Sequence, residues 1–264
     1  MAPPPYALCS TTLPKKEDDY MYRRFWLGLG VLVLFSRLAW AARPLDTEDP
    51  RTVPQGKGEF QGSVDATKGD DGALVGLKGS LGFGLLPTMD LRLQTALLWG
   101  DPQDAPSRVG MADGLLEFKH RLLDETATLP AFLYAITLRF PTSLGASGLG
   151  ENGVDATLLA VVGKTCGPLT LTWNGGYVFI SRDRALDLVL LSTSLEYRVT
   201  ETWSLVSEVV SAIGVNQAPT VAVLRVGATY SLTPRIKLDS AVGVGVTRAS
   251  PDVTVTVGTT IALF

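Results

Sequence analysis

Acidic and basic side chains recur at every second position of several short stretches of the sequence. Glu117, Lys119 and Arg121 are separated by apolar or aromatic residues, so in an extended chain the three point to one side. Paired carboxylates could act as general acid and base. Ion pairs in an enclosed space are favoured instead, because acids and bases are mixed on the same faces and a buried charge needs a partner. The charged residues assigned to this enclosed face are Lys78, Arg92, Glu117, Lys119, Arg121, Arg139, Glu196, Arg198, Glu208, Arg225, Lys237 and Asp239.

Residue types that carry nucleophilic, metal or cofactor chemistry are sparse. His120 is the single histidine, and the position two residues later, where outer-membrane phospholipases have a serine, is Leu122. The two cysteines, Cys9 and Cys166, are too far apart to indicate a disulfide framework or a metal site. Residues 148–153 match G-x-G-x-x-G, but a strand-like run follows instead of a helix. The sequence therefore predicts no catalytic residue, no cofactor and no metal.

The end of the sequence shows most clearly which element positions the charged side chains. Between residues 236 and 246 the even positions are mostly apolar, whereas the odd positions are charged, small or hydroxylated. A period of two indicates a strand with two different faces, and about ten residues suffice for a tilted strand to cross a membrane. A second run of this kind covers residues 253–263. We interpret the pair as the closing hairpin of a transmembrane β-barrel.

Similar alternation recurs from residue 56 to the end of the chain. The predicted fold class is therefore all-β, a transmembrane antiparallel up-and-down β-barrel of about twelve strands. Hydrophobic residues make up 46% of the chain and the mean hydropathy is +0.22, yet after residue 42 no apolar run approaches the roughly 18 residues of a membrane helix. The net charge of −3 provides no basic field, so nucleic acid is not an expected partner.

Connections between the predicted strands alternate in length. The short ones lie at residues 87–90, 166–168, 200–202 and 233–235. The longer ones, richer in Gly, Pro and charge, lie at residues 101–113, 143–155, 181–187 and 215–220. Short periplasmic turns and longer external loops are typical of outer-membrane barrels.

Aromatic residues on the apolar faces gather near the two ends of the predicted strands. Two belts of amphipathic rings, about one strand length apart, are typical of the two interfaces of a membrane. A soluble β-sandwich would also alternate, but its polar face would be rich in Lys and Glu, whereas Gly, Ser, Thr and Ala prevail here. The predicted belt residues are Phe83, Trp99, Phe118, Phe132, Tyr134, Phe140, Tyr177, Phe179, Tyr197, Trp203 and Tyr230.

The first part of the sequence has a different character. Two arginines precede an apolar stretch at residues 25–35, and small residues flank Trp40, which indicates a secretory signal peptide over residues 21–41. A membrane anchor is the alternative, but Arg37 interrupts the stretch before it reaches spanning length. We interpret residues 1–20 as an extension upstream of the true start, residues 42–55 as an irregular periplasmic lead-in, and residues 56–264 as the barrel.

Short motifs carry a resemblance across nearly all of the predicted mature chain. They are R-P-L-D-T-E at residues 43–48, V-P-Q-G-K at 53–57, L-E-F-K-H-R-L-L-D-E at 116–125, L-R-F-P-T at 138–142, N-G-G-Y at 174–177 and Y-S-L-T-P-R-I-K-L-D at 230–239. Together they are similar to the meta-pathway (MetA-pathway) phenol degradation family. The resemblance implies an outer-membrane, transporter-like barrel, associated in some members with uptake of aromatic or other hydrophobic compounds. His120 stands where this family usually has an aromatic residue.

These observations predict an outer-membrane channel or transporter-like protein of a Gram-negative-type bacterium, and not an enzyme. Its expected partners are outer-membrane lipid, a small-molecule permeant and the barrel-assembly machinery, which would contact the C-terminal strand ending at Phe264. The alternative is a plugged barrel with a structural or surface-interaction role and no transport. An excess of basic over acidic residues on the enclosed face favours a weak preference for anions. Strict alternation would turn Phe264 inward unless a bulge near Thr259 and Thr260 restores its outward direction.

Overall fold

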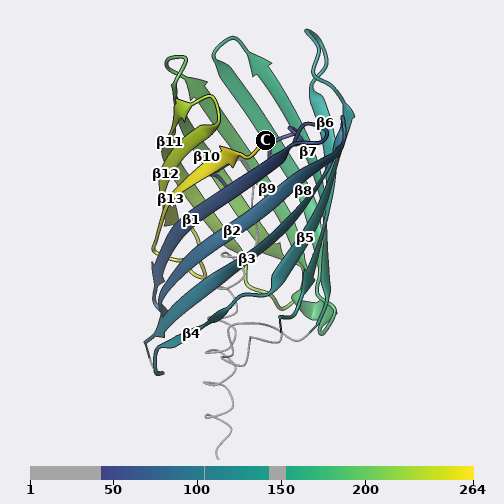
Figure 1. The fold of residues 1–264 in the computed structure, drawn as a ribbon. Coiled ribbons are helices and arrows are strands. Elements are labelled where there is room, and N and C mark those ends of the chain that lie inside the picture. The colour runs from purple at the N-terminus through teal and green to yellow at the C-terminus, as the bar shows by residue number, and fades with distance from the viewer. Residues whose placement is uncertain (1–42, 104, 143–152) are drawn as a thin grey trace, which may run out of the picture.

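The computed structural model describes residues 43–103, 105–142 and 153–264 (Figure 1). The predicted signal peptide, the extension before it and residues 148–152 of the Gly-rich motif lie outside the described residues. The elements are β1 (Gly58–Gly69), β2 (Gly72–Leu86), β3 (Met89–Pro102), β4 (Arg108–Met111), β5 (Gly114–Leu123), β6 (Ala131–Phe140), β7 (Asp155–Cys166), β8 (Leu169–Phe179), the 3-10 turn η1 (Arg184–Leu186), β9 (Leu188–Arg198), β10 (Trp203–Gly214), β11 (Val221–Thr233), β12 (Ile236–Gly245) and β13 (Val253–Ala262).

All neighbouring strands pair antiparallel, and the sheet closes on itself. Each strand pairs with the next along the chain except at β4, which pairs only with β3, while β5 pairs with β3 and β6; β1 also pairs with β13, with Glu59 opposite Ala262. Of the 13 strands, β4 and β5 follow one another along the same edge of β3, so together they fill one position and the barrel has twelve. Apart from the short β4, each described strand is paired on both sides, as a membrane requires of β-structure. The predicted all-β barrel of about twelve strands is confirmed.

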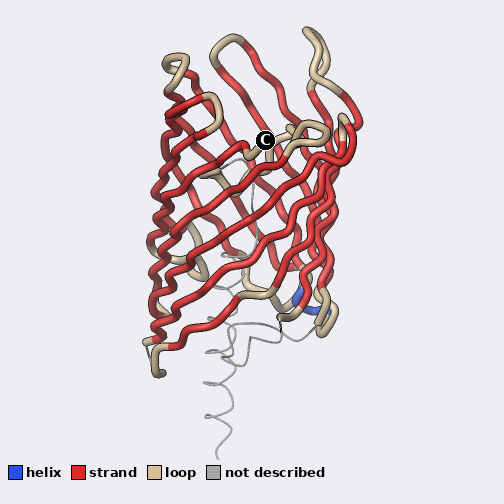
Figure 2. The backbone as a smooth tube through the Cα atoms, viewed as in Figure 1, coloured by secondary structure: helices blue, strands red, loops and turns tan. Residues whose placement is uncertain are grey.

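The two ends of the barrel differ in their connections (Figure 2). One end, here called the terminal end, holds the start of β1 and the end of β13, and its connections include the short link between β7 and β8. Gly167 in that link has φ of 60°, a left-handed conformation that favours glycine. The opposite end, here called the long-loop end, holds the β6–β7, β8–β9 and β10–β11 connections.

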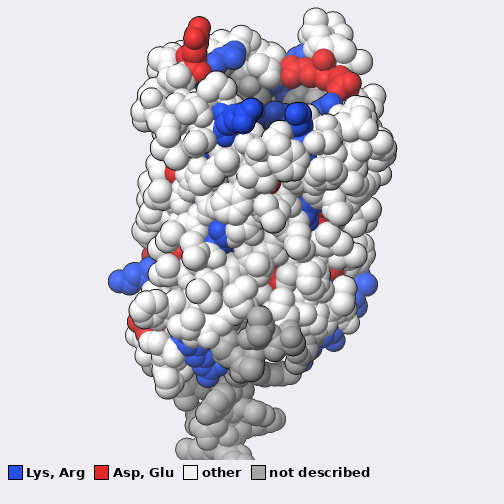
Figure 3. Space-filling view, viewed as in Figure 1, with Lys and Arg blue, Asp and Glu red and all other residues white. Residues whose placement is uncertain are grey.

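The outer wall is apolar along its height. Leu77, Leu93 and Leu205 are 58%, 53% and 55% exposed in the isolated chain, and Figure 3 shows few charged side chains on the wall between the two ends. An exposed apolar surface of this extent marks a membrane contact. Of the aromatic residues predicted for the belts, Phe83, Trp99, Tyr197 and Trp203 are exposed, and the Trp203 and Tyr230 rings, on paired strands, are 4.7 Å apart. Among the described residues, no helix is long and apolar enough to cross a membrane.

The C-terminal aromatic residue reaches the outer face without a bulge. The pairing of β13 with both neighbours runs without a register shift, so no bulge is present near Thr259 and Thr260, and the expectation that Phe264 would otherwise point inward was wrong. The strand ends at Ala262, and the two residues after it are free of the alternation. Gly58 and Phe60 are two residues apart on β1, so both face outward. A Cβ on Gly58 would lie 2.8 Å from Phe264 Cζ. The missing side chain at Gly58 therefore leaves the space in which the Phe264 ring packs.

Candidate functional site in the barrel lumen

Residues 43–54, here called the lumen segment, occupy the interior of the barrel. The segment precedes β1 and was expected on the periplasmic side as an irregular lead-in. It is irregular, but its polar groups bond to inward side chains of seven strands, β3, β5, β8, β10, β11, β12 and β13. The segment therefore lies in the lumen, and not outside the barrel on the periplasmic side as expected. Its charged groups find partners of opposite charge in the lumen.

The first half of the segment is held by two carboxylates of the wall. Arg43 Nη2 lies 3.0 Å from Asp239 Oδ1 on β12 and donates to Thr256 on β13 at 2.8 Å. Glu208 on β10 accepts hydrogen bonds from the backbone N–H groups of Asp46 and Thr47 and from the Thr47 hydroxyl, at 2.7–2.9 Å. Hydrogen bonds to a charged acceptor contribute about 1.5–3 kcal/mol each when buried. These contacts fix the segment to one side of the barrel.

Arg225 on β11 links the same part of the segment to the wall. Its guanidinium donates to Asp46 at 2.8 Å and also to Glu208, so one wall cation contacts the segment and the acid that holds it. Arg225 and Glu208 are both buried. The planar guanidinium suits this arrangement because it can donate to two carboxylates at once.

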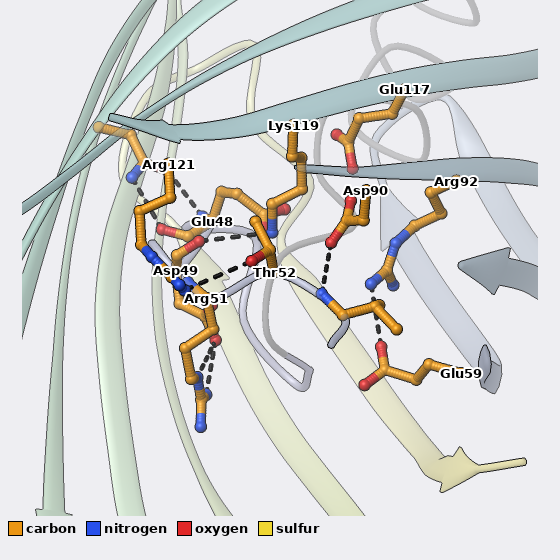
Figure 4. A network of polar contacts seen from close by, with 12 residues as sticks. Glu48, Asp49, Arg51, Thr52, Glu59, Asp90, Arg92, Glu117, Lys119 and Arg121 are labelled. Atoms are coloured by element: carbon orange, nitrogen blue, oxygen red, sulfur yellow. Dashed lines mark hydrogen bonds and ion pairs between the residues drawn. The ribbon is translucent and has the colours of Figure 1, made fainter. Parts of the chain in front are cut away.

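The second half of the segment is held from the opposite side (Figure 4). Lys119 Nζ on β5 lies 2.5 Å from Glu48 Oε1, and Asn174 on β8 accepts from the Glu48 N–H at 2.6 Å and donates to its carbonyl at 2.9 Å. Nearer β1, the Val53 N–H donates to Asp90 of β3 at 2.6 Å. The segment is therefore anchored on both sides and spans the lumen.

Inward glycines leave room for the segment. A Cβ on Gly84 would lie under 3.0 Å from the Pro54 carbonyl, and a Cβ on Gly163 would lie 2.7 Å from Pro50 Cγ. A Cβ on Gly258 would likewise lie under 3.0 Å from the Arg43 guanidinium. Close approach of this kind is possible only where the wall carries no side chain. The wall is thus shaped to the segment on three strands.

The segment separates two cavities. One, of about 90 Å³ on the long-loop side, is lined by Asp46 and Glu48 of the segment and by residues such as Gln94, Arg139 and Ile180. The other, of about 190 Å³ on the terminal side, is lined by Leu45, Thr47 and Asp49 together with Glu196 and Lys237. Asp46 and Glu48 thus face one cavity and Leu45, Thr47 and Asp49 face the other, so the segment lies between the two.

The ion pairs of the lumen contain more acids than cations, which corrects the expected excess of cations. The ion pairs join Lys78 to Asp65, Arg92 to Glu59, Lys119 to Glu48, Arg139 to Asp113 and Asp155, Arg225 to Glu208 and Asp46, and Arg43 to Asp239. Most of these acids were missed because they lie on the segment, on β1 or at strand ends near the loops. The predicted preference for anions was therefore built on an incomplete set of charges.

Of the remaining predicted lumen residues, Arg121, Glu196, Arg198 and Lys237 lie towards the terminal end, whereas Glu117 lines the long-loop-side cavity. Glu196 and Lys237 are half-buried beside the terminal-side cavity. Arg121 is half-buried, with its Nε 2.7 Å from the exposed Asp124 carboxylate, and it donates to Thr52 of the segment. Arg198 is exposed and reaches the Gly167 carbonyl at 3.3 Å. Glu117 is buried and accepts a weak hydrogen bond from Thr137 at 3.4 Å.

His120 faces outward in an aromatic group. Its Nδ1 lies 3.2 Å from the Tyr134 hydroxyl, and its ring packs edge-on against Tyr134 at 5.3 Å between centroids. Leu122, two residues on, is exposed. Within the described ranges no group of three or more His, Cys, Asp or Glu side chains could hold a metal ion. The chemistry of this molecule is concentrated in the charged contacts of the lumen.

The segment carries a carboxyl whose protonation depends on docking. Burial raises the pKa of Glu48 from 4.5 to about 8. The nearby acids Glu117 and Asp49 raise it further, whereas the cations Lys119 and Arg92 lower it. By contrast, the pKa of Asp49 is lowered, because Arg51 and Lys119 outweigh the effect of its burial. Between about pH 5 and 8, Glu48 is therefore the acid of the segment whose proton uptake accompanies docking.

Raising the pH is expected to loosen the segment. The docked form of Glu48 binds a proton more tightly than the released form, whose pKa is near 4.5, so the contribution to docking is complete below about pH 4.5 and is lost as pH rises towards 8. The free energy of docking can change by at most about 1.4 kcal/mol per pH unit, which is a tenfold change in the docking equilibrium. Fluorescence of a dye attached near Asp46 would report release between pH 5 and 8. Glu48→Gln should flatten this profile, and an unchanged profile in that variant would contradict the assignment.

The closed barrel, with its apolar outer wall and charged lumen, defines a transmembrane β-barrel protein. A family model described as "Putative MetA-pathway of phenol degradation" matches residues 41–263, and the chain belongs to this family. The structure is similar to an outer membrane channel from Pseudomonas putida F1, at 17% identity and a TM-score of 0.65 over 83% of this chain and 100% of the other.

Two porins share the same fold. The NanC porin matches at 9% identity and a TM-score of 0.56, over 78% of this chain and 100% of the porin. The KdgM porin matches at 11% identity and a TM-score of 0.55, over 78% of this chain and 99% of the porin. No curated protein gave a significant sequence match. The resemblance inferred from the short motifs is confirmed at the level of family and fold.

Proposed function

We propose that this chain is a bacterial outer-membrane channel for small molecules, closed at rest by its lumen segment. The observation that carries the proposal is that a short, irregular stretch crosses the lumen between two cavities, one on each side of it. Its anchors are ion pairs and hydrogen bonds to side chains, which can be exchanged for water without breaking the barrel. The terminal end would face the periplasm, as in other barrels of this class.

The permeants proposed are aromatic or other hydrophobic small molecules. The description of the family, which refers to phenol degradation, supports this class. The alternative, a plugged barrel without transport, draws support from the number of buried ion pairs that hold the segment. Breaking such a pair by moving one partner away costs several kcal/mol unless water replaces it.

Conductance and permeation of the intact chain separate these functions. Purified protein, shown to be folded by its heat-shifted gel mobility, would be placed in planar bilayers and in liposomes loaded for osmotic swelling. A channel gives discrete openings from a mostly closed state and passes phenol faster than empty liposomes do. A membrane that stays silent at every pH between 5 and 8, with no added permeation, would support the plugged barrel and reject the channel.

The C-terminal ring is proposed to guide assembly of the barrel. Phe264 packs beside Leu263 over Gly58, and so it joins the last strand to the first on the lipid side. Phe264→Ala is expected to slow insertion into membranes by the assembly machinery, because the exposed apolar signal is lost and the β1–β13 seam is less well packed. Time-resolved folding into liposomes that contain the machinery would show a slower appearance of heat-shifted protein. Gly58→Ala, which would displace the ring, should act in the same direction, and normal rates in both variants would contradict the proposal.

A further inference from the structure

Free hydroxyl groups line the wall of the terminal-side cavity. Thr172, Ser194 and Thr229, from β8, β9 and β11, line this cavity and are more than nine-tenths buried. Their hydroxyl groups form no hydrogen bond within the described part of the chain, and their oxygen atoms are not sealed off from the cavity. Because a buried hydroxyl group needs a hydrogen-bond partner, the three remain available to a polar molecule in the cavity.

One acid of this cavity, Glu196 on β9, forms no ion pair in the described part of the chain. It is half-buried and lies opposite Thr170 of β8. Arg51 of the lumen segment also lines the cavity, but it binds Asp49, with 2.5 Å between Arg51 Nη2 and Asp49 Oδ2 (Figure 4). Asp49 foremost, and also Glu196, raise the pKa of Arg51, so the Glu196 carboxylate lies within electrostatic range of the segment. Glu196 can therefore accept from a cation in the cavity.

One base of the cavity, Lys237 on β12, is likewise without an ion pair among the described residues. It is half-buried, and Asp239, two residues further along the same face, binds Arg43 at 3.0 Å. Thr229 pairs with Asp239, so Thr229 and Lys237 are diagonal neighbours on the inner face. An ammonium group and a hydroxyl group are thus available together on β11 and β12.

An apolar surface lies between these two charged places. Strands β10 and β11 separate β9 from β12, and Val206 of β10 lies opposite Glu196. Val206 and Leu45 of the segment both line the cavity, and both are buried. The cavity volume of about 190 Å³ exceeds the roughly 150 Å³ of an apolar cavity that holds benzene, so a molecule of about benzene's size fits.

The charges of the cavity select one class of ligand. The other charged residues that line it are already paired, Arg43 with Asp239, Arg51 with Asp49 and Glu125 with Lys164. One carboxylate and one ammonium group therefore remain. A ligand with a single charge would leave Glu196 or Lys237 without a partner, whereas a ligand with one charge of each sign meets both.

We propose that the terminal-side cavity binds a small zwitterion, an amino acid whose ammonium and carboxylate groups are separated by a short apolar chain. The ammonium group would donate to Glu196 and Ser194, the carboxylate would accept from Lys237 and Thr229, and the chain would lie against Val206. A zwitterion is hydrophilic, so this ligand differs from the permeants proposed above and the site adds a second binding function to the barrel.

Equilibrium binding to the intact, refolded protein in lipid nanodiscs tests the site. 4-Aminobutanoate, butanoate and butylamine would be titrated by isothermal calorimetry at neutral pH, with empty nanodiscs as background. 4-Aminobutanoate is expected to bind at least about tenfold more tightly than either analogue, because each analogue lacks one charged hydrogen-bonding group. Equal affinity for the three molecules would overturn the proposal. No binding of 4-aminobutanoate would mean that water alone meets the two charges, and would overturn it too.

Two charge-removing variants separate a ligand contact from a structural role. Glu196→Gln should abolish the preference for 4-aminobutanoate over butanoate and keep the preference over butylamine, because only the partner of the ammonium group is lost. Lys237→Gln should do the reverse. Glu201→Gln, which removes a charge from an exposed turn at the same end of the barrel, is the control and should change neither preference. Loss of both preferences in each cavity variant would overturn the assignment. A barrel that failed to conduct would leave these preferences intact, so failure of the proposed channel function is distinguishable.

Discussion

A chain without residues 43–51 should conduct almost continuously, whereas the intact chain is expected to be closed nearly all the time. The deleted residues make the contacts to Asp239, Glu208, Arg225, Asn174 and Lys119 that close the lumen. A docking preference of only about 3 kcal/mol keeps a lumen open about 1% of the time, so loss of the segment should raise the mean conductance about 100-fold. Single-channel recording in planar bilayers measures this directly.

A second variant shows whether contacts or length close the lumen. Replacing residues 43–51 with a Gly-Ser linker of the same length keeps the chain continuous but removes its charged groups and the Pro50 contact with Gly163. Such a linker behaves as a flexible coil and forms none of the fixed contacts, so this variant should conduct like the deletion. A closed lumen in both variants, with normal heat-shifted mobility, would show that the wall side chains themselves block the path.

The sequence predicted the barrel well because a membrane leaves few alternatives. In lipid every backbone group must be satisfied, so alternating runs such as those of β12 and β13 have to pair in a closed sheet. The alternation of polar and apolar positions then indicated which residues face the lumen. Lys119, Arg139 and Glu208 belong to that set and are buried. Alternation also placed Trp203 and Tyr230 on paired positions of the outer face, where their rings pack.

The lumen segment could not be predicted from the same pattern. Residues 43–54 have no period, so nothing local distinguishes a strand-like run from a stretch that lies in a lumen. One signal was available: the predicted inner face carried more basic than acidic residues, and buried cations need acids. Asp46 and Glu48 are two of those acids. The inward glycines, such as Gly84 and Gly163, were a second signal, because they leave space for something other than strand side chains.

Replacing Arg139 with methionine should destabilise the barrel by about 3–5 kcal/mol, because it leaves two carboxylates without their shared cation. Arg139 bonds to Asp113 and Asp155, whose side chains are only 2% and 4% exposed, near the long-loop end of β6. Asp155 also accepts from the Ser181 N–H at 2.9 Å, so the loss would loosen the β8–β9 connection as well. Urea unfolding in lipid vesicles, followed by tryptophan fluorescence, gives the free energy of unfolding.

Two further variants decide whether this cost arises from burial. Adding Asp113→Asn and Asp155→Asn to Arg139→Met removes the two buried negative charges that Arg139 binds and should restore most of the stability. Asp124→Ala removes an ion-pair partner of Arg121 that is 72% exposed, and it should cost under about 1 kcal/mol. If Arg139→Met cost no more than Asp124→Ala, water would have to reach the Arg139 ion pair freely. The lumen would then be hydrated up to the segment on its long-loop side, and the segment alone would separate a water-filled vestibule from the terminal-side cavity.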